Sequence, residues 1–300
     1  MEYAKQSELE MASLKTAEAQ MARRGKIAEA LISKERPELI DLLSTYQNEA
    51  VAARRLLNRS LIELDIGAEI LEVGGGILAL SIQLASEGFK VTTVEPIGEG
   101  FAGISFIADI YAQIAREENS TFKLIQTPIE ECEFDHRFDF IFSINVMEHL
   151  KDPYSVLLQL VLVLKQGGVY RFFCPNYDFP YEPHFGKWMF RRKNRAFYLP
   201  PLRAKSKRIS VSEWQGVYGS LNFITYKKLL FFFSQSNIRY EVNTNALREL
   251  AHRSEFDKEL QNRHKLLSYV VKFLFKSRLI RVINLLPSRN WPIIDLQIFH

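Results

Sequence analysis

Three consecutive glycines with a glutamate on either side have the spacing of a site for a nucleotide cofactor. The glycines are Gly74, Gly75 and Gly76, and they follow a short apolar run. Glycine lets the backbone turn sharply and lets a ligand approach where a Cβ would collide, while the N–H groups of the next helix favour an anion. Glu95 lies about 20 residues after the turn, where a carboxylate can accept hydrogen bonds from both hydroxyls of a ribose. The turn and Glu95 are therefore predicted to hold a ribose-containing cofactor.

Glu72 distinguishes between two cofactors that would fit this turn. Gly74, Gly76 and Ala79 satisfy the spacing of the dinucleotide fingerprint, so a nicotinamide-dependent, NAD(P)-using oxidoreductase is one interpretation. Glu72, however, stands two residues before the first glycine, where its charge would lie near the diphosphate of a dinucleotide. The same anion suits a ligand that carries an ammonium and a sulfonium. We therefore prefer S-adenosyl-L-methionine as the cofactor.

The residues that support this preference also carry a resemblance. The segment Glu72-Val73-Gly74-Gly75-Gly76 and the pair Glu95-Pro96 resemble the first motif and the second strand end of the class I S-adenosylmethionine-dependent methyltransferases. In that family a third glycine is usual where this chain has Leu78, and the larger side chain predicts a tighter methionine pocket. Relatives often use an acid after the third strand to bond the adenine amino group. Here Gln126, Thr127 or Glu130 must take that role.

The run from Phe138 to Pro153 extends the resemblance. It is similar to the fourth strand and the loop after it in small-molecule methyltransferases, and Asn145 stands at the polar exit of that strand as a further candidate for cofactor binding. Asp152 is expected to cap the next helix, with Pro153 at its first position. We expect Gly167-Gly168 to end this helix and a fifth strand to follow.

The chain order predicts an α/β fold. Short apolar runs indicate strands, and they occur at residues 70–73, 91–94, 169–173, 238–242 and 293–299 and in the run from Phe138. Helical spacing occurs at residues 7–34, 37–59, 77–86, 156–164 and 245–286 and after the cap at 221–225. This alternation predicts a doubly wound, Rossmann-like, mostly parallel seven-stranded sheet with helices on both faces. The resemblance implies that the last strand enters antiparallel beside the fifth.

We divide the chain into three parts. Residues 1–62 form an N-terminal helical extension that covers the cofactor cleft, and residues 63–243 form the cofactor-binding catalytic core. The core contains an excursion rich in proline, aromatic and basic residues at 176–216. Residues 244–300 add a helical insertion and the final strand.

The acceptor site is expected after the fifth strand, because ligands of open α/β sheets bind beyond the carboxyl ends of the strands. Methyl transfer to a hydroxyl needs alignment and removal of a proton. His184 has a suitable ordinary pKa for this role, with Glu182 available to orient it, and His149 is the rival. This loop loosely resembles methyltransferases of polysaccharide biosynthesis, so we expect a small-molecule or glycan hydroxyl, with a lipid-linked acceptor as one form.

Other acceptors and functions leave signatures that can be compared with the sequence. A nucleic-acid amino-methylating enzyme would end its fourth strand in Asn/Asp-Pro-Pro-aromatic, and residues 143–146 do not. A carbon-5 RNA enzyme would use a cysteine such as Cys174, but nothing in the sequence identifies an activating environment for its thiolate. We therefore do not expect a nucleic-acid partner. A non-catalytic binding protein with a degenerate core is the remaining alternative, suggested by Leu78 and by the missing acid near Thr127.

Composition and charge set the expected compartment. The chain has 300 residues, of which 47% are apolar, enough for a large core. Two cysteines form neither a disulfide framework nor a metal site, which favours a reducing, cytoplasmic location. Residues 1–150 carry 14 Lys and Arg against 25 Asp and Glu, and residues 151–300 carry 25 against 10. The basic helical region 265–281 suggests a second hypothesis, peripheral contact with the anionic inner face of a membrane. The sequence does not indicate an oligomeric state.

Overall fold

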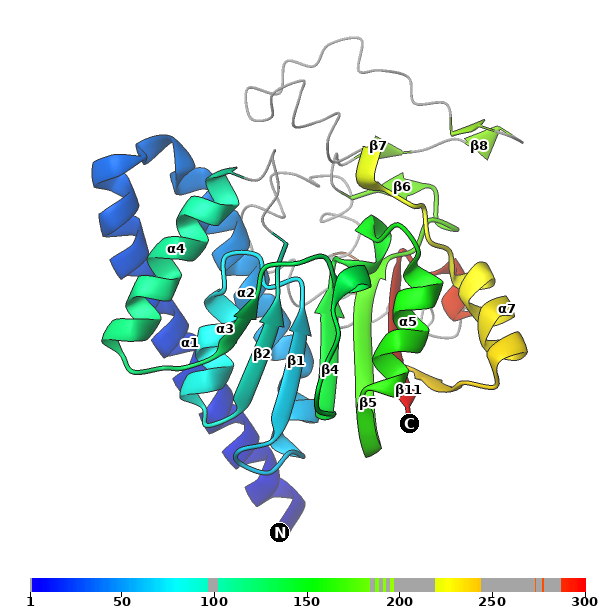
Figure 1. Cartoon of the computed structure of the whole chain (residues 1–300), viewed down its shortest axis with the longest axis horizontal. Coiled ribbons are helices and arrows are strands. Elements are labelled where there is room, and N and C mark those ends of the chain that lie inside the picture. The colour runs from blue at the N-terminus through cyan, green and yellow to red at the C-terminus, as the bar shows by residue number, and fades with distance from the viewer. Residues whose placement is uncertain are drawn as a thin grey trace. The chain divides into compact units, whose positions relative to one another are not determined.

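A mostly parallel sheet organises the protein, as the sequence predicts. The computed structural model describes residues 2–96, 102–183, 187–188, 191–192, 195–196, 219–243, 273, 277 and 287–300. Seven strands form one sheet in the order β10-β11-β5-β4-β1-β2-β3 (Figure 1). They span Glu69–Val73 (β1), Lys90–Val94 (β2), Lys123–Ile125 (β3), Phe138–Ile144 (β4), Leu164–Pro175 (β5), Arg239–Val242 (β10) and Ile293–Phe299 (β11). β1 pairs in parallel with β2 and β4, β2 pairs in parallel with β3, and β10 pairs antiparallel with β11.

The predicted helices at residues 7–34, 37–59, 77–86 and 156–164 and after the cap at 221–225 are present, with ends shifted by a few residues. The helix at Ala102–Glu117 was not predicted, and nearly all of the helix predicted at 245–286 lies outside the described residues. The α-helices in the described residues include Glu2–Glu35 (α1), Ile40–Ile62 (α2), Ala79–Ser86 (α3), Ala102–Glu117 (α4), Pro153–Leu162 (α5) and Tyr226–Ser236 (α7). Short 3-10 turns lie at Pro37–Leu39 (η1), Ile129–Glu131 (η2), Met147–His149 (η3) and Ser288–Asn290 (η4). Two-residue strands lie at Tyr181–Glu182 (β6), Lys187–Trp188 (β7), Arg191–Arg192 (β8) and Arg195–Ala196 (β9). None of the described helices is both long and apolar enough to cross a membrane.

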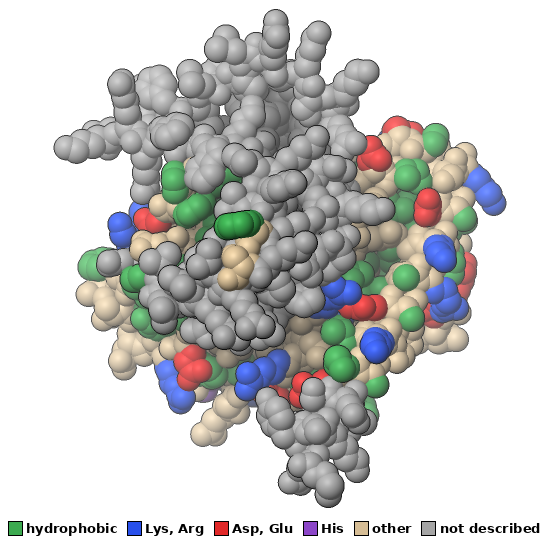
Figure 2. Space-filling model, turned by 180° about the vertical axis from the view of Figure 1, so that it is seen from behind, with side chains coloured by type: hydrophobic (Ala, Val, Ile, Leu, Met, Phe, Trp, Pro, Cys, Tyr) green, Lys and Arg blue, Asp and Glu red, His purple; other side chains and the backbone are tan. Residues whose placement is uncertain are grey.

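The chain divides into two units, which we describe separately. The first contains Met1–Ile144, Gln159–Tyr170 and His300, and the second contains Asn145–Leu158 and Arg171–Phe299. Most of the basic region 265–281 lies outside the described residues, so its contact with a membrane stays a prediction. On the face drawn in Figure 2, the described Lys and Arg side chains are interspersed with Asp and Glu.

In the first unit, the N-terminal helices pack on the helices that follow the cofactor turn. Figure 1 shows α1, α2 and α4 side by side. Their shared core holds buried side chains of α1, α2, α3 and α4, among them Ile32, Leu43, Ile82 and Ile107. Buried apolar area of this kind is the main source of stability for amphipathic helices. α2 is therefore packed on α3, which begins after the cofactor turn, and on α4.

Gly167 and Gly168 were expected to end a helix, and this expectation is wrong. α5 ends at Leu162, and both glycines lie inside β5. Gly167 has a φ of +78°, and a Cβ on Gly168 would lie 3.0 Å from the carbonyl oxygen of Phe138. Because the strand passes so close to this carbonyl, the position requires glycine for space rather than as a helix stop.

A buried ion pair joins two strands of the second unit. Arg171 on β5 donates to both carboxylate oxygens of Asp295 on β11, over 2.9 Å and 2.7 Å. The two side chains are 4% and 0% exposed, and Asn243 also donates to Asp295. A buried charge is tolerated only when its partner is present with good geometry, so each member of the pair depends on the other.

This dependence predicts the effect of removing one charge. Asp295→Asn keeps the size of the side chain but removes the carboxylate that bonds the buried Arg171 guanidinium at two nitrogens, so we expect the free energy of unfolding to fall by about 3 to 5 kcal/mol in urea titrations. The matched control is Glu241→Gln on β10, whose partner Arg239 is exposed, and it should change little. Equal losses in the two variants would contradict this account of the pair.

Candidate functional site

The turn after β1 has the backbone that its three glycines suggested. Gly74 and Gly76 have φ angles of +85° and +53°, a region that side chains other than glycine rarely adopt. Gly75 is required for a different reason, because a Cβ there would lie 2.3 Å from the Cγ2 methyl of Thr93. The N–H of Gly74 donates to the carbonyl of Val94 over 2.8 Å, which ties the turn to the end of β2. Sequence and structure therefore agree on a narrow, side-chain-free turn.

Glu95 lies against this turn. The Gly76 N–H donates to Glu95 Oε2 over 2.7 Å, and the Gly75 N–H also bonds to this carboxylate. The backbone N–H of Glu95 donates to the carbonyl of Ile125 at the end of β3. Burial raises the pKa of Glu95, and the two N–H donors oppose that rise. A carboxylate held between two strand ends in this way presents its remaining acceptor capacity to a ligand at the turn.

Glu72 is the most strongly perturbed carboxyl of this site. It lies on β1 with 4% of its surface exposed, and the Ser81 hydroxyl of α3 donates to its Oε2 atom. The pKa of Glu72 is raised to about 8, chiefly by burial; the Ser81 hydrogen bond opposes this rise, and the nearby Glu95 carboxylate adds to it. At neutral pH the carboxyl is therefore substantially protonated, and a nearby cation would favour its ionised form.

The other predicted cofactor residues follow three strand ends. Pro96 directly follows Glu95 and is exposed, whereas Thr127 is half-buried in the loop after β3. In that loop the Cys132 thiol lies 3.8 Å from the Thr127 carbonyl oxygen. Asn145 directly follows β4 with a φ of +57°, and its N–H donates to the carbonyl of Phe173. Their roles in cofactor binding stay predictions.

Leu78 stands where the family often has glycine, and it keeps the left-handed backbone conformation that glycine would adopt easily. Leu78 adopts a left-handed conformation with φ +65° at the start of α3, yet its side chain is only 1% exposed. The side chain packs in the apolar cluster that also contains Leu43 of α2 and Tyr111 of α4. Leu78 thus combines an unfavourable backbone conformation with a fully buried side chain. Sequence reasoning placed this side chain in the methionine pocket and missed the cluster.

The acceptor-side candidates lie in the second unit. The Nδ1 atom of His149 is 2.8 Å from the Ser220 hydroxyl. The side-chain amide of Asn222 donates to the carbonyls of Met147 and Leu150, which holds the turn that carries His149. The ring is thus fixed in orientation, as a general base or a structural histidine would be.

Glu182 has a partner that the sequence did not suggest. The Tyr177 hydroxyl donates to Glu182 Oε1 over 3.2 Å, and both side chains are buried. Burial raises the pKa of Tyr177 above its ordinary value, and the Glu182 and Glu148 carboxylates raise it further, so the phenol stays protonated. The predicted partner, His184, lies outside the described residues.

Cys174 is not poised as a nucleophile. The thiol is buried, and burial raises its pKa well above the ordinary value, with the Glu148 and Asp295 carboxylates adding to the rise. A thiolate nucleophile needs the opposite shift. The structure thus agrees with the decision to set aside cysteine-dependent RNA methylation.

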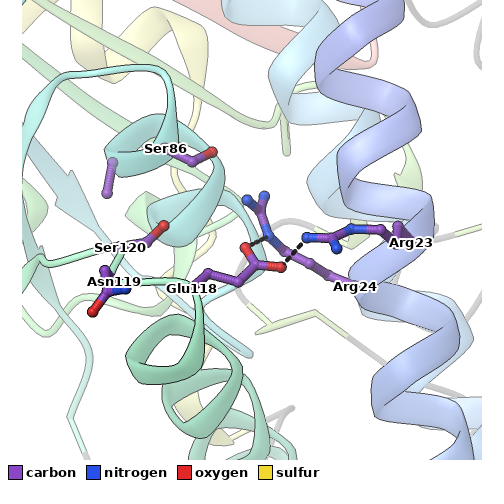
Figure 3. A pocket seen from close by; sticks show the side chains of 7 residues that line it. Arg23, Arg24, Ser86, Glu118, Asn119 and Ser120 are labelled. Carbon is purple, nitrogen blue, oxygen red and sulfur yellow. Dashed lines mark hydrogen bonds and ion pairs between the residues drawn. The ribbon is translucent and has the colours of Figure 1, made fainter.

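A cavity of about 490 Å³ lies away from this site, at the far end of α3. It is lined by Arg23, Arg24, Ala85, Ser86, Glu118, Asn119 and Ser120. Figure 3 shows both arginines pointing toward Glu118, and Arg24 donates to this carboxylate over 2.7 Å. Arg24 also donates to Gln83. None of the predicted cofactor residues lines the cavity, so it is separate from the glycine turn.

Comparison with known proteins identifies the family. Residues 44–206 match the methyltransferase domain family. An uncharacterized protein of Mycobacterium tuberculosis is 35% identical over 264 residues, which cover 87% of this chain and 89% of that protein. The ubiquinone biosynthesis O-methyltransferase of Rickettsia akari is 32% identical over 112 residues, which cover 37% of this chain and 40% of that protein.

Solved structures were also compared. Coclaurine N-methyltransferase, solved with N-methylheliamine and S-adenosylhomocysteine (SAH), gives a TM-score of 0.45 at 14% identity, covering 83% of this chain and 71% of that one. The plantazolicin methyltransferase BpumL, solved with SAH, gives a TM-score of 0.48 at 13% identity, covering 95% and 99%.

The chain belongs to the methyltransferase domain family, because the family match covers more than half of it. The predicted class, a class I S-adenosylmethionine-dependent methyltransferase, is confirmed by this match together with the seven-stranded sheet. The glycine turn and Glu95 lie inside the matched residues.

The contacts of Glu95 predict a binding defect. Glu95→Ala removes the carboxylate that bonds the turn and that we expect to bond the ribose hydroxyls, an interaction of roughly 1.5 to 3 kcal/mol. Titration calorimetry should therefore show SAH binding weakened about tenfold or more. Glu63→Ala, on an exposed acid outside this turn, is the control. If Glu95→Ala binds SAH like the unmodified protein, Glu95 does not hold the ribose.

Proposed function

We propose that the protein transfers a methyl group from S-adenosyl-L-methionine to an oxygen of a small molecule or saccharide, including a lipid-linked one. The observation that carries the cofactor half of this proposal is the glycine turn bonded to Glu95, with the buried Glu72 beside it. The oxygen acceptor is supported by the resemblance of the acceptor-side loop and by the relative that is an O-methyltransferase. That relative matches only part of the chain, so its own acceptor is not carried over.

The residues at the turn fit this cofactor. The positive φ angles of Gly74 and Gly76 leave the turn without side chains where a ligand must come close. Glu95 would hold the ribose hydroxyls, and Glu72 would lie toward the cationic methionine end. When bound, the cofactor supplies an electrophilic methyl group on a sulfonium. The nicotinamide alternative has no comparable support, because the family is that of methyltransferases.

The remaining task of the protein is to align the acceptor and to remove its proton. In-line displacement depends on alignment, and a hydroxyl acceptor gains from a base within hydrogen-bond reach. We assign the base to His184, with His149 as the rival. His149 is held through Nδ1 by the Ser220 hydroxyl. Glu182, bonded to Tyr177, would orient the base or the acceptor.

Glu72 predicts a proton that is released when the cofactor binds. Near pH 7 the carboxyl is largely protonated because its folded pKa is about 8, and a bound sulfonium and ammonium should favour its ionised form. Calorimetry in buffers of different ionisation enthalpy should therefore show release of a fraction of a proton per cofactor at pH 7. Glu72→Gln should abolish this release.

The same shift sets a pH trend for stability without ligand. The folded pKa of Glu72 lies above its value in the unfolded chain, so the folded state holds a proton between about pH 4.5 and pH 8 that the unfolded state has lost. This contribution is complete below pH 4.5 and is lost as the pH rises to 8. The free energy of unfolding, measured with urea, should therefore fall less between pH 4.5 and pH 8 for Glu72→Gln than for the unmodified protein. If the two proteins lose the same free energy over this range, Glu72 is not a buried, protonated carboxyl.

The base assignment predicts a loss of turnover without loss of cofactor. His184→Ala should lower the methyl transfer rate by roughly 10² to 10⁴, while SAH affinity measured by calorimetry stays near that of the unmodified protein. His149→Ala is measured in parallel. Full activity in His184→Ala together with loss in His149→Ala would transfer the role to His149. Cofactor binding with no transfer to any hydroxyl acceptor would favour the non-catalytic alternative.

A further inference from the structure

An aromatic residue of the N-terminal helices lies on the cofactor turn. A Cβ built on Gly76 would meet the Tyr46 ring at 3.4 Å from Cδ1 and 3.5 Å from Cε1. These are ordinary van der Waals distances, so the ring rests directly over the glycine whose φ is +53°. Tyr46 belongs to α2 and is half-buried, so part of the ring remains accessible beside the turn.

From this contact we infer that Tyr46 is a cofactor-binding residue whose ring recognises the cationic methionine end of S-adenosyl-L-methionine. The inference rests on the proposed cofactor and names a side chain that the sequence pattern did not identify. Aromatic rings attract cations through the negative face of their π-system. Glu72 lies two residues before the same turn, and Glu95 accepts a hydrogen bond from it. The ring and these two acids are together suited to a positive ligand.

The position of Tyr46 is fixed by its neighbours on α2. Gln47 donates to the Tyr111 hydroxyl of α4 over 3.1 Å, and it packs so tightly on α1 that a Cβ on Gly25 would lie 2.7 Å from its Nε2 atom. Leu43, one turn earlier, is 1% exposed. α2 is therefore locked on both sides of Tyr46, and the ring is held over the turn before any ligand arrives.

Leu78 connects the same helices to the other end of the turn. Its buried side chain shares an apolar cluster with Leu43, and Tyr46 packs against the same cluster. Movement of α2 away from the turn would thus expose Leu78 as well as withdraw Tyr46. The N-terminal helices then contribute a side chain to the cofactor site, in addition to covering the cleft as the sequence predicts.

Two ligands that differ in charge separate the possible roles of the ring. S-adenosyl-L-methionine carries a sulfonium, and SAH carries a neutral thioether with the same adenosine and amino acid groups. Calorimetry of both ligands should give near-normal affinities for Tyr46→Phe, which keeps the ring. Tyr46→Leu should bind S-adenosyl-L-methionine roughly 3- to 30-fold more weakly, with a smaller loss for SAH.

Three results would overturn the inference. Unchanged binding in Tyr46→Leu would show that the ring does not contact the cofactor. Equal loss of both ligands would show that the ring does not recognise the sulfonium, which is the one charge that SAH lacks. A loss in Tyr46→Phe as large as in Tyr46→Leu would assign the effect to the hydroxyl.

Matched controls separate these outcomes from misfolding and from failure of the proposed cofactor. Phe106→Leu removes an aromatic ring of α4 from the same helical cluster and leaves the anchors of Tyr46 in place, and its affinities should match those of the unmodified protein. Thermal unfolding without ligand shows whether Tyr46→Leu is folded. If the unmodified protein binds neither ligand, the cofactor assignment itself fails; if it binds both and the Tyr46 variants do too, only the role of Tyr46 fails.

Discussion

The hydrogen bond from the Gly76 N–H to Glu95 is the interaction on which the cofactor site depends. It joins the turn after β1 to the end of β2, and the N–H of Glu95 continues the connection to β3. Parallel strands bring these ends to one edge of the sheet, but the sheet alone does not set the shape of the turn. The carboxylate does so by bonding backbone donors that only a side-chain-free segment can present. The ribose-binding acid is thus also a structural part of the turn.

Holding the turn in this shape costs free energy, through desolvation of the two carboxyls and through backbone strain at Leu78. Burial of Glu72 and Glu95 disfavours their charged forms, which leaves both carboxyls responsive to a cation. Leu78 keeps a left-handed backbone because its side chain is buried among the helices. Strain and desolvation of this kind are common where a protein must recognise a charged ligand, and here the N-terminal helices supply the apolar packing that offsets them.

Local patterns predicted the parts of the fold that local physics decides. Apolar runs located the strands of the main sheet except the three-residue β3. Asp152 was predicted as a helix cap and accepts hydrogen bonds from the N–H groups of Tyr154 and Ser155, and the glycines with Glu95 located the turn. Features set by distant contacts were missed. Gly168 is glycine because of the Phe138 carbonyl, and Tyr46 reaches Gly76 only through helix packing. No spacing rule connects residues so far apart in the chain, and His184 lies outside the described residues.

The Arg171–Asp295 pair has a consequence for the order of folding. The two residues are 124 positions apart, and β11, which carries Asp295, lies between β5 and β10 in the sheet. During synthesis β5 is complete long before its neighbour exists, so the chain must carry an unpaired strand edge and an uncompensated guanidinium until β11 emerges. Such non-local pairing slows folding and exposes the unfinished edge to other chains. Production of the protein should therefore be sensitive to the rate of translation and to chaperones that shield strand edges.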